Sequence, residues 1–120
     1  MHIPFTKAHG ARNDFLLTWR ESIPASLSLD LARAAIAICD RHTGVGADGW
    51  LLVSSSEKES AKGADAAIQL LNSDGSPSEI SGNGTRCAAA FLIDAGKATD
   101  GVAIATGEFY YDEEDAPSLP

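Results

Sequence analysis

Residues 81–93 constrain this 120-residue chain most, because a glycine-rich turn leads directly into an apolar run. The turn reads Ser-Gly-Asn-Gly over residues 81–84, and Ala-Ala-Ala-Phe-Leu-Ile occupies residues 88–93. An apolar run without a polar face predicts a helix that is buried on all sides, and Gly96 provides its end. We therefore expect a central helix over residues 83–95, with a sheet wrapped around it.

The start of this helix has the features of an anion-binding site. Glycines at 82 and 84 remove side chains where the backbone would approach a ligand closely. The first turn of a helix also presents unpaired N–H groups and the positive end of the helix dipole. The turn thus predicts a cradle for a carboxylate or a phosphate. Ser81 has a structural interpretation as well, since serine is among the best helix N-caps.

Apolar and β-branched runs predict five strands, at residues 3–7, 15–19, 50–54, 66–71 and 102–106. Residues 29–41 carry apolar side chains at helical spacing and predict an amphipathic helix that covers the sheet. The third and fourth strands are expected to pair as a hairpin. Together these elements predict an α/β domain of the α+β type: a strongly bent mixed or antiparallel sheet around the central helix.

The domain is expected to span residues 1–106, and residues 107–120 are expected to form a disordered acidic tail. The net charge is −8, and five acids but no base follow Gly107. No basic cluster offers a face to nucleic acid. No apolar run reaches the roughly 20 residues that span a membrane, and the start of the chain does not resemble a signal peptide. These features favour a cytoplasmic protein without a nucleic-acid or membrane partner.

The cysteines and histidines do not indicate a metal site or a disulfide framework. Cys39 and Cys87 both fall in predicted helices and are expected to be free thiols. The three histidines are scattered, without the spacing of metal ligands. Cys87 lies six residues beyond Ser81, on a different side of the helix, and is expected to be a core residue.

Residues 44–49 match the pattern G-x-G-x-x-G, which occurs in dinucleotide-binding sites. That fingerprint follows a strand and opens a helix. Here the pattern follows a predicted helix and leads into a predicted strand. We therefore interpret these glycines as a helix stop followed by a tight turn.

Asn13 and Asn72 have two interpretations. An asparagine side chain offers both donors and acceptors, so it can hold the ammonium and the carboxylate of an amino acid. Asparagine also forms turns through bonds to its own backbone. The residues alone leave both interpretations open.

Three motifs together resemble the N-terminal domain of diaminopimelate epimerase. They are Lys-Ala-His-Gly-Ala-Arg-Asn-Asp-Phe over residues 7–15, Arg-His-Thr-Gly-Val-Gly-Ala-Asp-Gly over 41–49, and the segment over 72–87 that holds Asn-Ser-Asp-Gly and Ser-Gly-Asn-Gly-Thr-Arg-Cys. The resemblance implies an isomerase of lysine biosynthesis that interconverts LL- and meso-diaminopimelate without pyridoxal phosphate or another cofactor. It implies that substrate is bound by Asn13, Asn72, Gly82 and Asn83.

The main departure from this family is Ser81, which stands where the family has its first catalytic cysteine. In the family one cysteine thiolate removes the α-proton and a second cysteine thiol protonates the opposite face. A serine hydroxyl is a poor proton acceptor unless a base lies beside it. The chain is therefore expected to hold half of a site and to be inactive by itself, with the other half from a missing C-terminal domain or from a homodimer partner.

Two alternatives remain open. The chain could be a catalytically inactive domain that binds an amino acid or serves in dimerisation, as Ser81 and the acidic tail suggest. It could also belong to a related racemase or epimerase that acts on another amino acid. The motifs over residues 7–15 and 41–49 favour diaminopimelate.

Overall fold

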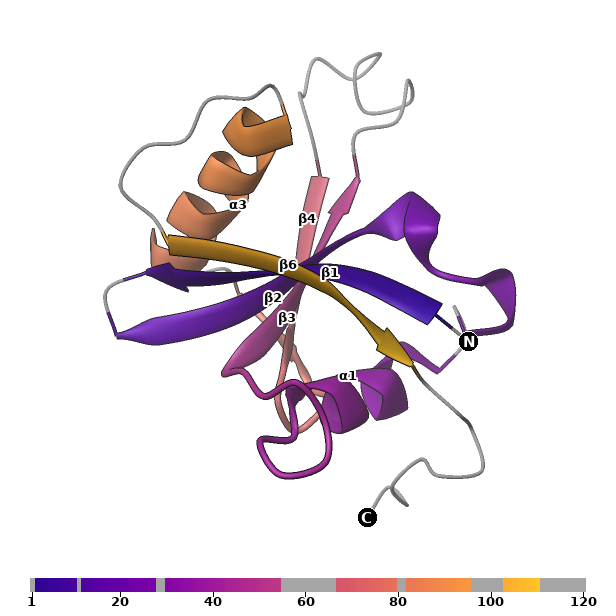
Figure 1. The fold of residues 1–120 in the computed structure, drawn as a ribbon. Coiled ribbons are helices and arrows are strands. Elements are labelled where there is room, and N and C mark those ends of the chain that lie inside the picture. Colours follow the sequence, from indigo (N-terminus) through magenta and orange to yellow (C-terminus); the bar gives the residue numbers. More distant parts are fainter. Residues whose placement is uncertain are drawn as a thin grey trace.

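The computed structural model describes residues 2–10, 12–27, 30–54, 67–79, 82–95 and 103–110. In this part of the chain six strands form one twisted sheet in the order β5-β4-β3-β2-β1-β6 (Figure 1). The strands are β1 (His2–Gly10), β2 (Asn13–Trp19), β3 (Gly49–Ser54), β4 (Ala67–Asn72), β5 (Pro77–Ser78) and β6 (Ala103–Tyr110). The helices are α1 (Leu31–Cys39) and α3 (Gly82–Ala95), and two 3₁₀ turns, η1 (Arg20–Ser22) and η2 (Ala25–Leu27), follow β2.

The sheet is mixed, which confirms the predicted fold class. Strands β2 and β3 are parallel, and every other neighbouring pair is antiparallel. Parallel neighbours need a crossover, and α1 provides it between β2 and β3. The predicted antiparallel pairing of the third and fourth strands is confirmed by β3 and β4. Their connection lies outside the described residues.

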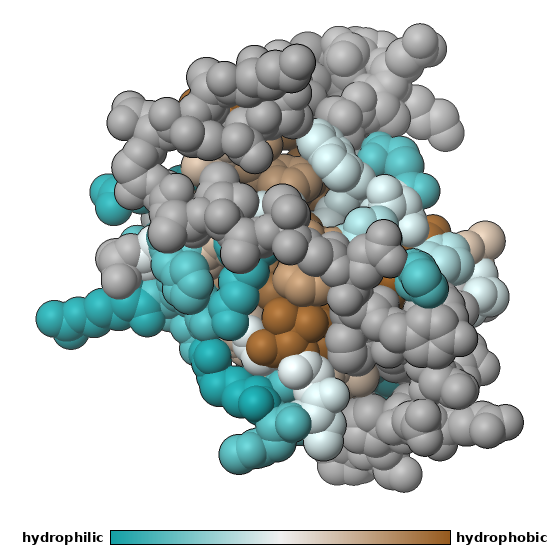
Figure 2. Space-filling view, in the orientation of Figure 1, coloured by the Kyte–Doolittle hydropathy of each residue, from teal (hydrophilic) through white to brown (hydrophobic). Residues whose placement is uncertain are grey.

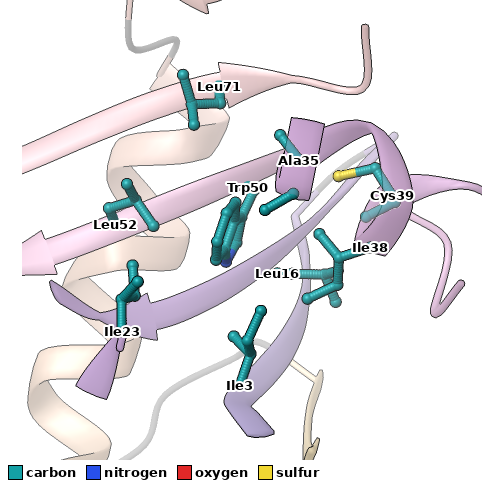
Figure 3. Packing of buried hydrophobic residues seen from close by; sticks show 11 residues of the cluster. Ile3, Leu16, Ile23, Ala35, Ile38, Cys39, Trp50, Leu52 and Leu71 are labelled. Atoms are coloured by element: carbon teal, nitrogen blue, oxygen red, sulfur yellow. The ribbon is translucent and has the colours of Figure 1, made fainter. Parts of the chain in front are cut away.

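The two helices pack on opposite faces of the sheet, so the central strands are buried on both sides. On one face, Leu16 and Trp50 of the sheet face Ile38 and Cys39 of α1 (Figure 3). On the other face, alternate residues of the same strands pack against α3. This second cluster comprises Ala8, Phe15, Leu17, Leu51, Val53, Leu70, Cys87, Ala88 and Phe91.

The helix α3 begins at Gly82, one residue before the predicted start, and has an exposed side as well as a buried one. Cys87 and Ala88 are fully buried, whereas Ile93 is 47% exposed. The expectation of burial on all sides was therefore wrong, because the sheet covers only one side of the helix in the described part of the chain. Figure 2 shows apolar side chains gathered at the middle of the viewed face, with hydrophilic side chains beside them. None of the described helices is long and apolar enough to cross a membrane.

The glycines after α1 end that helix, as the sequence indicated. The helix stops at Cys39, and the backbone N–H groups of Val45 and Gly46 donate to the carbonyl oxygen of Ile38. A side chain at Gly44 would collide with backbone carbonyl oxygens of α1, and Gly46 has a φ of 89°. The helix is shorter than the predicted range 29–41, because these bonds replace its last turn.

Two strand boundaries also differ from the prediction. The pairing of β1 with β2 continues to Gly10 and Asn13, so most of the predicted loop over residues 9–14 belongs to strands. Strand β6 continues past Thr106 to Tyr110, because it pairs with the whole length of β1 up to His2. The predicted strand end at Thr106 was thus four residues too early. Residues 111–120 lie outside the described part, and the predicted tail there stays a prediction.

Candidate functional site

The turn-side end of the β1–β2 pair meets the first turn of α3. Gly10 ends β1, and a Cβ atom there would lie 3.1 Å from the sulfur of Cys87 and 3.6 Å from the carbonyl oxygen of Asn83. Glycine thus permits the close approach of β1 to the helix. Asn13, the first residue of β2, receives a hydrogen bond of 2.9 Å at its Oδ1 from the Nδ2 of Asn83. The structure therefore brings two of the predicted substrate-binding residues into contact.

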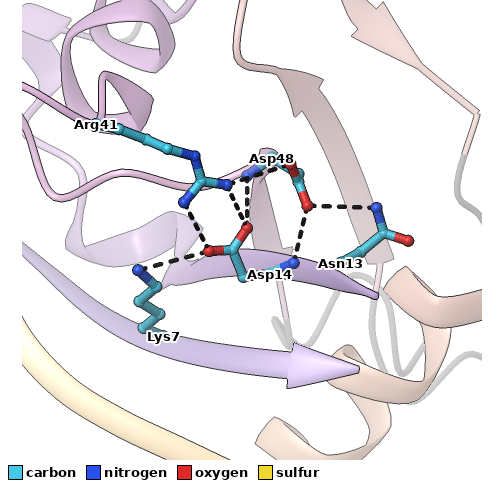
Figure 4. A network of polar contacts seen from close by, with 5 residues as sticks. All are labelled: Lys7, Asn13, Asp14, Arg41 and Asp48. Carbon is cyan, nitrogen blue, oxygen red and sulfur yellow. Dashed lines mark hydrogen bonds and ion pairs between the residues drawn. The ribbon is translucent and has the colours of Figure 1, made fainter. Parts of the chain in front are cut away.

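The other end of the Asn13 amide contacts a network of charged residues (Figure 4). Asn13 Nδ2 donates to Asp48 Oδ2 over 3.3 Å, and the backbone N–H of Asp14 donates to the same oxygen over 3.0 Å. Arg41 makes two hydrogen bonds to Asp14, of 2.8 and 3.0 Å, and one of 3.2 Å to Asp48 Oδ1. The ammonium of Lys7 lies 3.6 Å from Asp14.

This network shifts the pKa values of Asp14 and Arg41. The hydrogen bonds from Arg41 hold the pKa of Asp14 well below its usual range, and the backbone N–H of Asp48 lowers it further. The Asp14 carboxylate in turn raises the pKa of Arg41. The Asp14 side chain is only 12% exposed, whereas that of Arg41 is 53% exposed, so the carboxylate is the more enclosed partner.

Sequence reasoning did not identify Asp14, Arg41 and Asp48 as members of one site. Arg41 and Asp48 lie in one motif and Asp14 lies in another. The signal that could have joined them is that each motif holds both an acid and a base. The parallel pairing of β2 with β3 then places residue 48, which precedes β3, beside the start of β2. Without this pairing, the chain offers several other ways to match its acids and bases.

Asn72 ends β4 and belongs to a tight turn. Its backbone N–H donates to the carbonyl oxygen of Ser76 over 2.8 Å, and its Nδ2 donates to Ser76 Oγ over 3.1 Å. Ser76 Oγ donates to Asp74 over 2.6 Å, and Gly75 completes the turn with a φ of 87°. Asn72 therefore belongs to a turn, but its side chain bonds the Ser76 hydroxyl, whereas the turn-forming interpretation expected a bond to the backbone. This bond holds the side-chain amide in one orientation.

Asn13 and Asn72 line the same cavity, which has a volume of about 300 Å³. The other residues that line it are Phe15, Asp48, Leu70, Ser78 and Glu79. A second cavity of about 290 Å³ also includes Asn13 and Asp48, with the cationic residues Arg12 and Arg41 and with His9. Asn13 and Asp48 therefore belong to both cavities. The cavity shared with Asn72 combines amide groups, carboxylates and two apolar walls, a combination suited to a polar molecule with an aliphatic chain.

Gly82 lies at the start of α3, next to Asn83, and is exposed. Apart from its chain neighbours and the backbone of its own helix, no atom of the described residues would lie within 4 Å of a Cβ atom at Gly82, so the space beside this backbone is open among them. Ser81, the predicted catalytic position, lies outside the described residues. Four of the predicted site residues are thus described: Asn13 and Asn83 are in contact, Gly82 is adjacent to Asn83, and Asn72 shares a cavity with Asn13.

The two cysteines are both buried and free. Burial raises the pKa of Cys87, and burial raises the pKa of Cys39 to about 12. Cys87 packs in the cluster between α3 and the sheet, as expected for a core residue. A neutral buried thiol is a poor base, so the burial of Cys87 favours a packing role.

Comparison with known proteins places these features in one family. The family model described as diaminopimelate epimerase matches residues 5–109. The diaminopimelate epimerase of Nostoc punctiforme is 46% identical over 94 residues, which are 78% of this chain and 32% of that protein. That of Caldanaerobacter subterraneus subsp. tengcongensis is 41% identical over 92 residues, 77% of this chain and 30% of that protein.

A solved structure of similar fold is that of methylitaconate-delta-isomerase. It superimposes with a TM-score of 0.63 at 16% identity, over 84% of this chain and 29% of that one, and so supports the fold alone. The chain spans about a third of the length of the curated relatives it matches. The match of the family model over nearly the whole sequence, together with these identities, shows that the chain belongs to the diaminopimelate epimerase family.

Proposed function

We propose that this chain binds diaminopimelate at the N-terminus of α3 and forms one half of an epimerase site. The observation that carries the proposal is the contact of Asn13 with Asn83, next to the open backbone of Gly82. Two motifs that resemble those of the family thereby form a single site. Membership of the family supports the identity of the ligand.

The proposed ligand has two ends of the same chemistry, each with an ammonium and a carboxylate. The α-carboxylate of the reacting end binds the backbone N–H groups at Gly82 and Asn83, where the helix dipole favours an anion. The amides of Asn13 and Asn72 bind the rest of the molecule from the cavity that they share. An amide has two N–H groups and two oxygen lone pairs, so the bonds to Asp48, Asn83 and Ser76 do not use the full capacity of either side chain. The apolar walls formed by Phe15 and Leu70 accommodate the aliphatic chain.

The proposed chemistry is inversion at the α-carbon without a cofactor. One base removes the α-proton, and an acid on the opposite face delivers a proton, so the carbon changes configuration with no net loss or gain of atoms. Ser81 occupies the position of the first base, and its hydroxyl is a far weaker base than a thiolate. The second acid or base comes from outside these 120 residues, in a further domain or a second copy of the chain.

Binding is tested by titrating the ¹⁵N-labelled chain with meso-diaminopimelate and following its amide resonances. We expect the signals of the four proposed binding residues to shift: Asn13, Asn72, Gly82 and Asn83. The signals of Thr18 and Ile38, on the opposite face of the sheet, should stay unchanged. Lysine, which lacks the second carboxylate, is the matched control ligand and should bind more weakly. Shifts spread evenly over both faces, or none at all, would remove the basis of the proposal.

Chemistry is tested by the loss of the α-proton signal of diaminopimelate in deuterated water. Neither the unchanged chain nor its Ser81→Cys variant is expected to exchange this proton by itself. The variant is expected to do so when the C-terminal domain of a relative is supplied. Exchange by the isolated chain would show that another base works here and would overturn the half-site proposal.

The alternative function is an inactive domain that binds an amino acid or serves in dimerisation, and Ser81 favours it. Ligand binding without any exchange, even by Ser81→Cys with the added domain, would support the binding domain. Sedimentation of the unchanged chain at several concentrations tests the dimerisation domain. Such a domain should form a dimer without ligand and without any substitution at Ser81.

A further inference from the structure

We propose that Asp48 is a positioning residue that sets the orientation of the Asn13 side-chain amide and, through it, that of Asn83. The inference rests on the proposed function, in which both asparagines bind the ligand. Asp48 is separated from Asn13 by 35 positions in the chain, and its carboxylate reaches both the side chain of Asn13 and the backbone of the next residue.

An ionised carboxylate has no hydrogen to donate, so the group that faces Asp48 Oδ2 at 3.3 Å must be the NH₂ end of the Asn13 amide. The Oδ1 end of Asn13 then faces α3, where it can only accept. Asn83 must therefore turn its own NH₂ end toward Asn13, as the 2.9 Å bond requires. One acid thus removes the freedom of two amides to flip.

The two oxygens of Asp48 have separate roles. Oδ1 accepts from Arg41 over 3.2 Å and so joins the charged network. Oδ2 accepts from both the Asn13 side chain and the backbone N–H of Asp14. The second oxygen therefore holds Asn13 at its side chain and at the peptide bond that follows it. If Asp48 served only to stabilise the fold, its bonds to Arg41 and to the backbone N–H of Asp14 would be sufficient, and the bond to the Asn13 side chain would not be needed.

Three variants separate these roles. Asp48→Ala removes every acceptor. Asp48→Asn keeps one oxygen, which can still accept from Asn13 and from the Asp14 backbone, and loses the ion pair with Arg41. Arg41→Met removes the same ion pair from the other side, together with both bonds of Arg41 to Asp14, and leaves the side chain of Asp48 unchanged. If Asp48 acts by positioning, Asp48→Asn and Arg41→Met should both keep the orientation of the Asn13 amide, because both keep an oxygen at position 48 that accepts from it, and Asp48→Ala should lose that orientation.

The first readout is the pair of side-chain ¹⁵N–¹H₂ signals of Asn13 and of Asn83, which needs no ligand. In Asp48→Ala both pairs are expected to move toward the values of a solvent-exposed asparagine. In Asp48→Asn and Arg41→Met they are expected to stay near their positions in the unchanged chain. Signals of Asn13 that do not move in Asp48→Ala, while backbone spectra show a folded chain, would overturn the proposal.

The second readout is the affinity for meso-diaminopimelate. In Asp48→Ala the Asn13 amide is no longer held in one orientation, and binding of diaminopimelate is expected to weaken about tenfold. In the other two variants it should weaken no more than about threefold. Equal weakening in all three variants would assign the effect to the ion pair and contradict positioning. If the unchanged chain binds no diaminopimelate, the proposed function fails, whereas the side-chain spectra still decide the role of Asp48.

Discussion

Asn83 donates a hydrogen bond of 2.9 Å to Asn13, although 70 positions separate the two residues in the chain. The bond joins the start of α3 to the start of β2 and so combines two sequence motifs in one place. A ligand at the open Gly82 backbone is therefore also next to the amide of Asn13, which is bound to the charged network around Asp14. This arrangement makes specific predictions for single variants.

Gly82→Ala is expected to separate ligand binding from folding. Outside its own helix and its chain neighbours, the added Cβ would contact none of the described residues within 4 Å, so the free energy of unfolding should change by less than about 1 kcal/mol. The same methyl group would occupy the space through which a carboxylate approaches the helix N-terminus, and affinity for diaminopimelate should fall about tenfold or more. Urea unfolding and an NMR titration measure the two effects.

Gly44→Ala is the matched control for Gly82→Ala. Its Cβ would lie 2.8 Å from the carbonyl oxygen of Ile38, in a turn that ends α1. We expect a loss of about 2 kcal/mol or more in the free energy of unfolding, with binding changed only through the population of folded chain. Unchanged binding by Gly82→Ala would contradict the proposed carboxylate site.

Ser76→Ala is expected to raise the pKa of Asp74 toward its ordinary value. The Ser76 hydroxyl donates to Asp74 and is the main cause that lowers this pKa, and the backbone N–H of Ser76 adds to the effect. The variant removes the hydroxyl alone, so part of the shift should remain. The ¹³C signal of the Asp74 carboxyl group, followed from pH 2 to pH 6, measures the change.

The same variant also removes the acceptor for Asn72 Nδ2. Affinity for diaminopimelate should therefore fall by a few-fold, about the worth of one neutral hydrogen bond that holds an amide in place. Ser76→Thr keeps the hydroxyl and serves as the control. An unmoved Asp74 pKa in Ser76→Ala would show that the backbone N–H alone carries the effect.

The sequence predicted the elements of this fold better than their ends. The periodicity of residues 29–41 and the apolar run over residues 88–93 predicted both long helices, because side-chain burial follows helix geometry closely. The end of β6 could not be predicted from the residues around it. Residues 107–110 lack a clear alternation, and they are strand because β1 offers a long partner.

The candidate site was predictable in part. Asn13 and Asn83 lie in motifs that resemble family motifs, and their contact agrees with a shared role. The role of Asp48 could not be predicted, since it depends on the parallel pairing of β2 with β3 and on the turn after α1. Such long-range pairing has no local signal in the chain. The ligand-binding roles of Asn13, Asn72, Gly82 and Asn83 stay predictions.

Acid should weaken the fold through Asp14. The pKa of this carboxyl group in the folded chain is lowered chiefly by Arg41, below its value of about 3.9 in the unfolded chain. The unfolded chain therefore binds the proton first as the pH falls. The stabilisation by Asp14 is present in full above about pH 5 and is lost progressively as the pH falls through 4 toward the lowered pKa of the folded chain.

Asp14→Asn is the variant that tests this pH dependence. The variant should be less stable than the unchanged chain at pH 7, and the difference should shrink between pH 5 and pH 3, as measured by urea unfolding at each pH. Arg41→Met, which removes the main cause of the shift, should also flatten the pH dependence. A constant difference between Asp14→Asn and the unchanged chain across this range would contradict the assignment.

Thr18→Val should destabilise the core although it keeps the shape of the side chain. Thr18 is 1% exposed; its Oγ1 accepts from the indole N–H of Trp50 over 2.8 Å and donates to the carbonyl oxygen of Pro4 over 3.0 Å. Valine would leave the buried indole N–H of Trp50 without this partner and would also remove the part-buried bond to Pro4, at a cost of about 1–3 kcal/mol in the free energy of unfolding.

Thr18→Ser is the control for Thr18→Val, because it keeps the hydroxyl and removes only a methyl group. Its loss of stability should be about 1 kcal/mol, from the small cavity that remains. The tryptophan fluorescence of the chain, from Trp19 and Trp50, measures the unfolding of both variants in urea. A greater loss for serine than for valine would show that packing, and not the pair of hydrogen bonds, is the main role of Thr18.

Thiol reactivity should distinguish position 81 from both natural cysteines. Burial raises the pKa of Cys39 to about 12 and also raises the pKa of Cys87, so at pH 8 neither thiol should react with Ellman's reagent until the chain unfolds.

In Ser81→Cys the new thiol directly precedes α3, where a helix N-terminus favours the thiolate. One rapid equivalent and two slow ones are expected in the folded variant, and three rapid equivalents in 6 M guanidinium. A slow thiol at position 81 would argue against a base position at the start of this helix, since the proposed chemistry requires a group there that is both accessible and readily ionised.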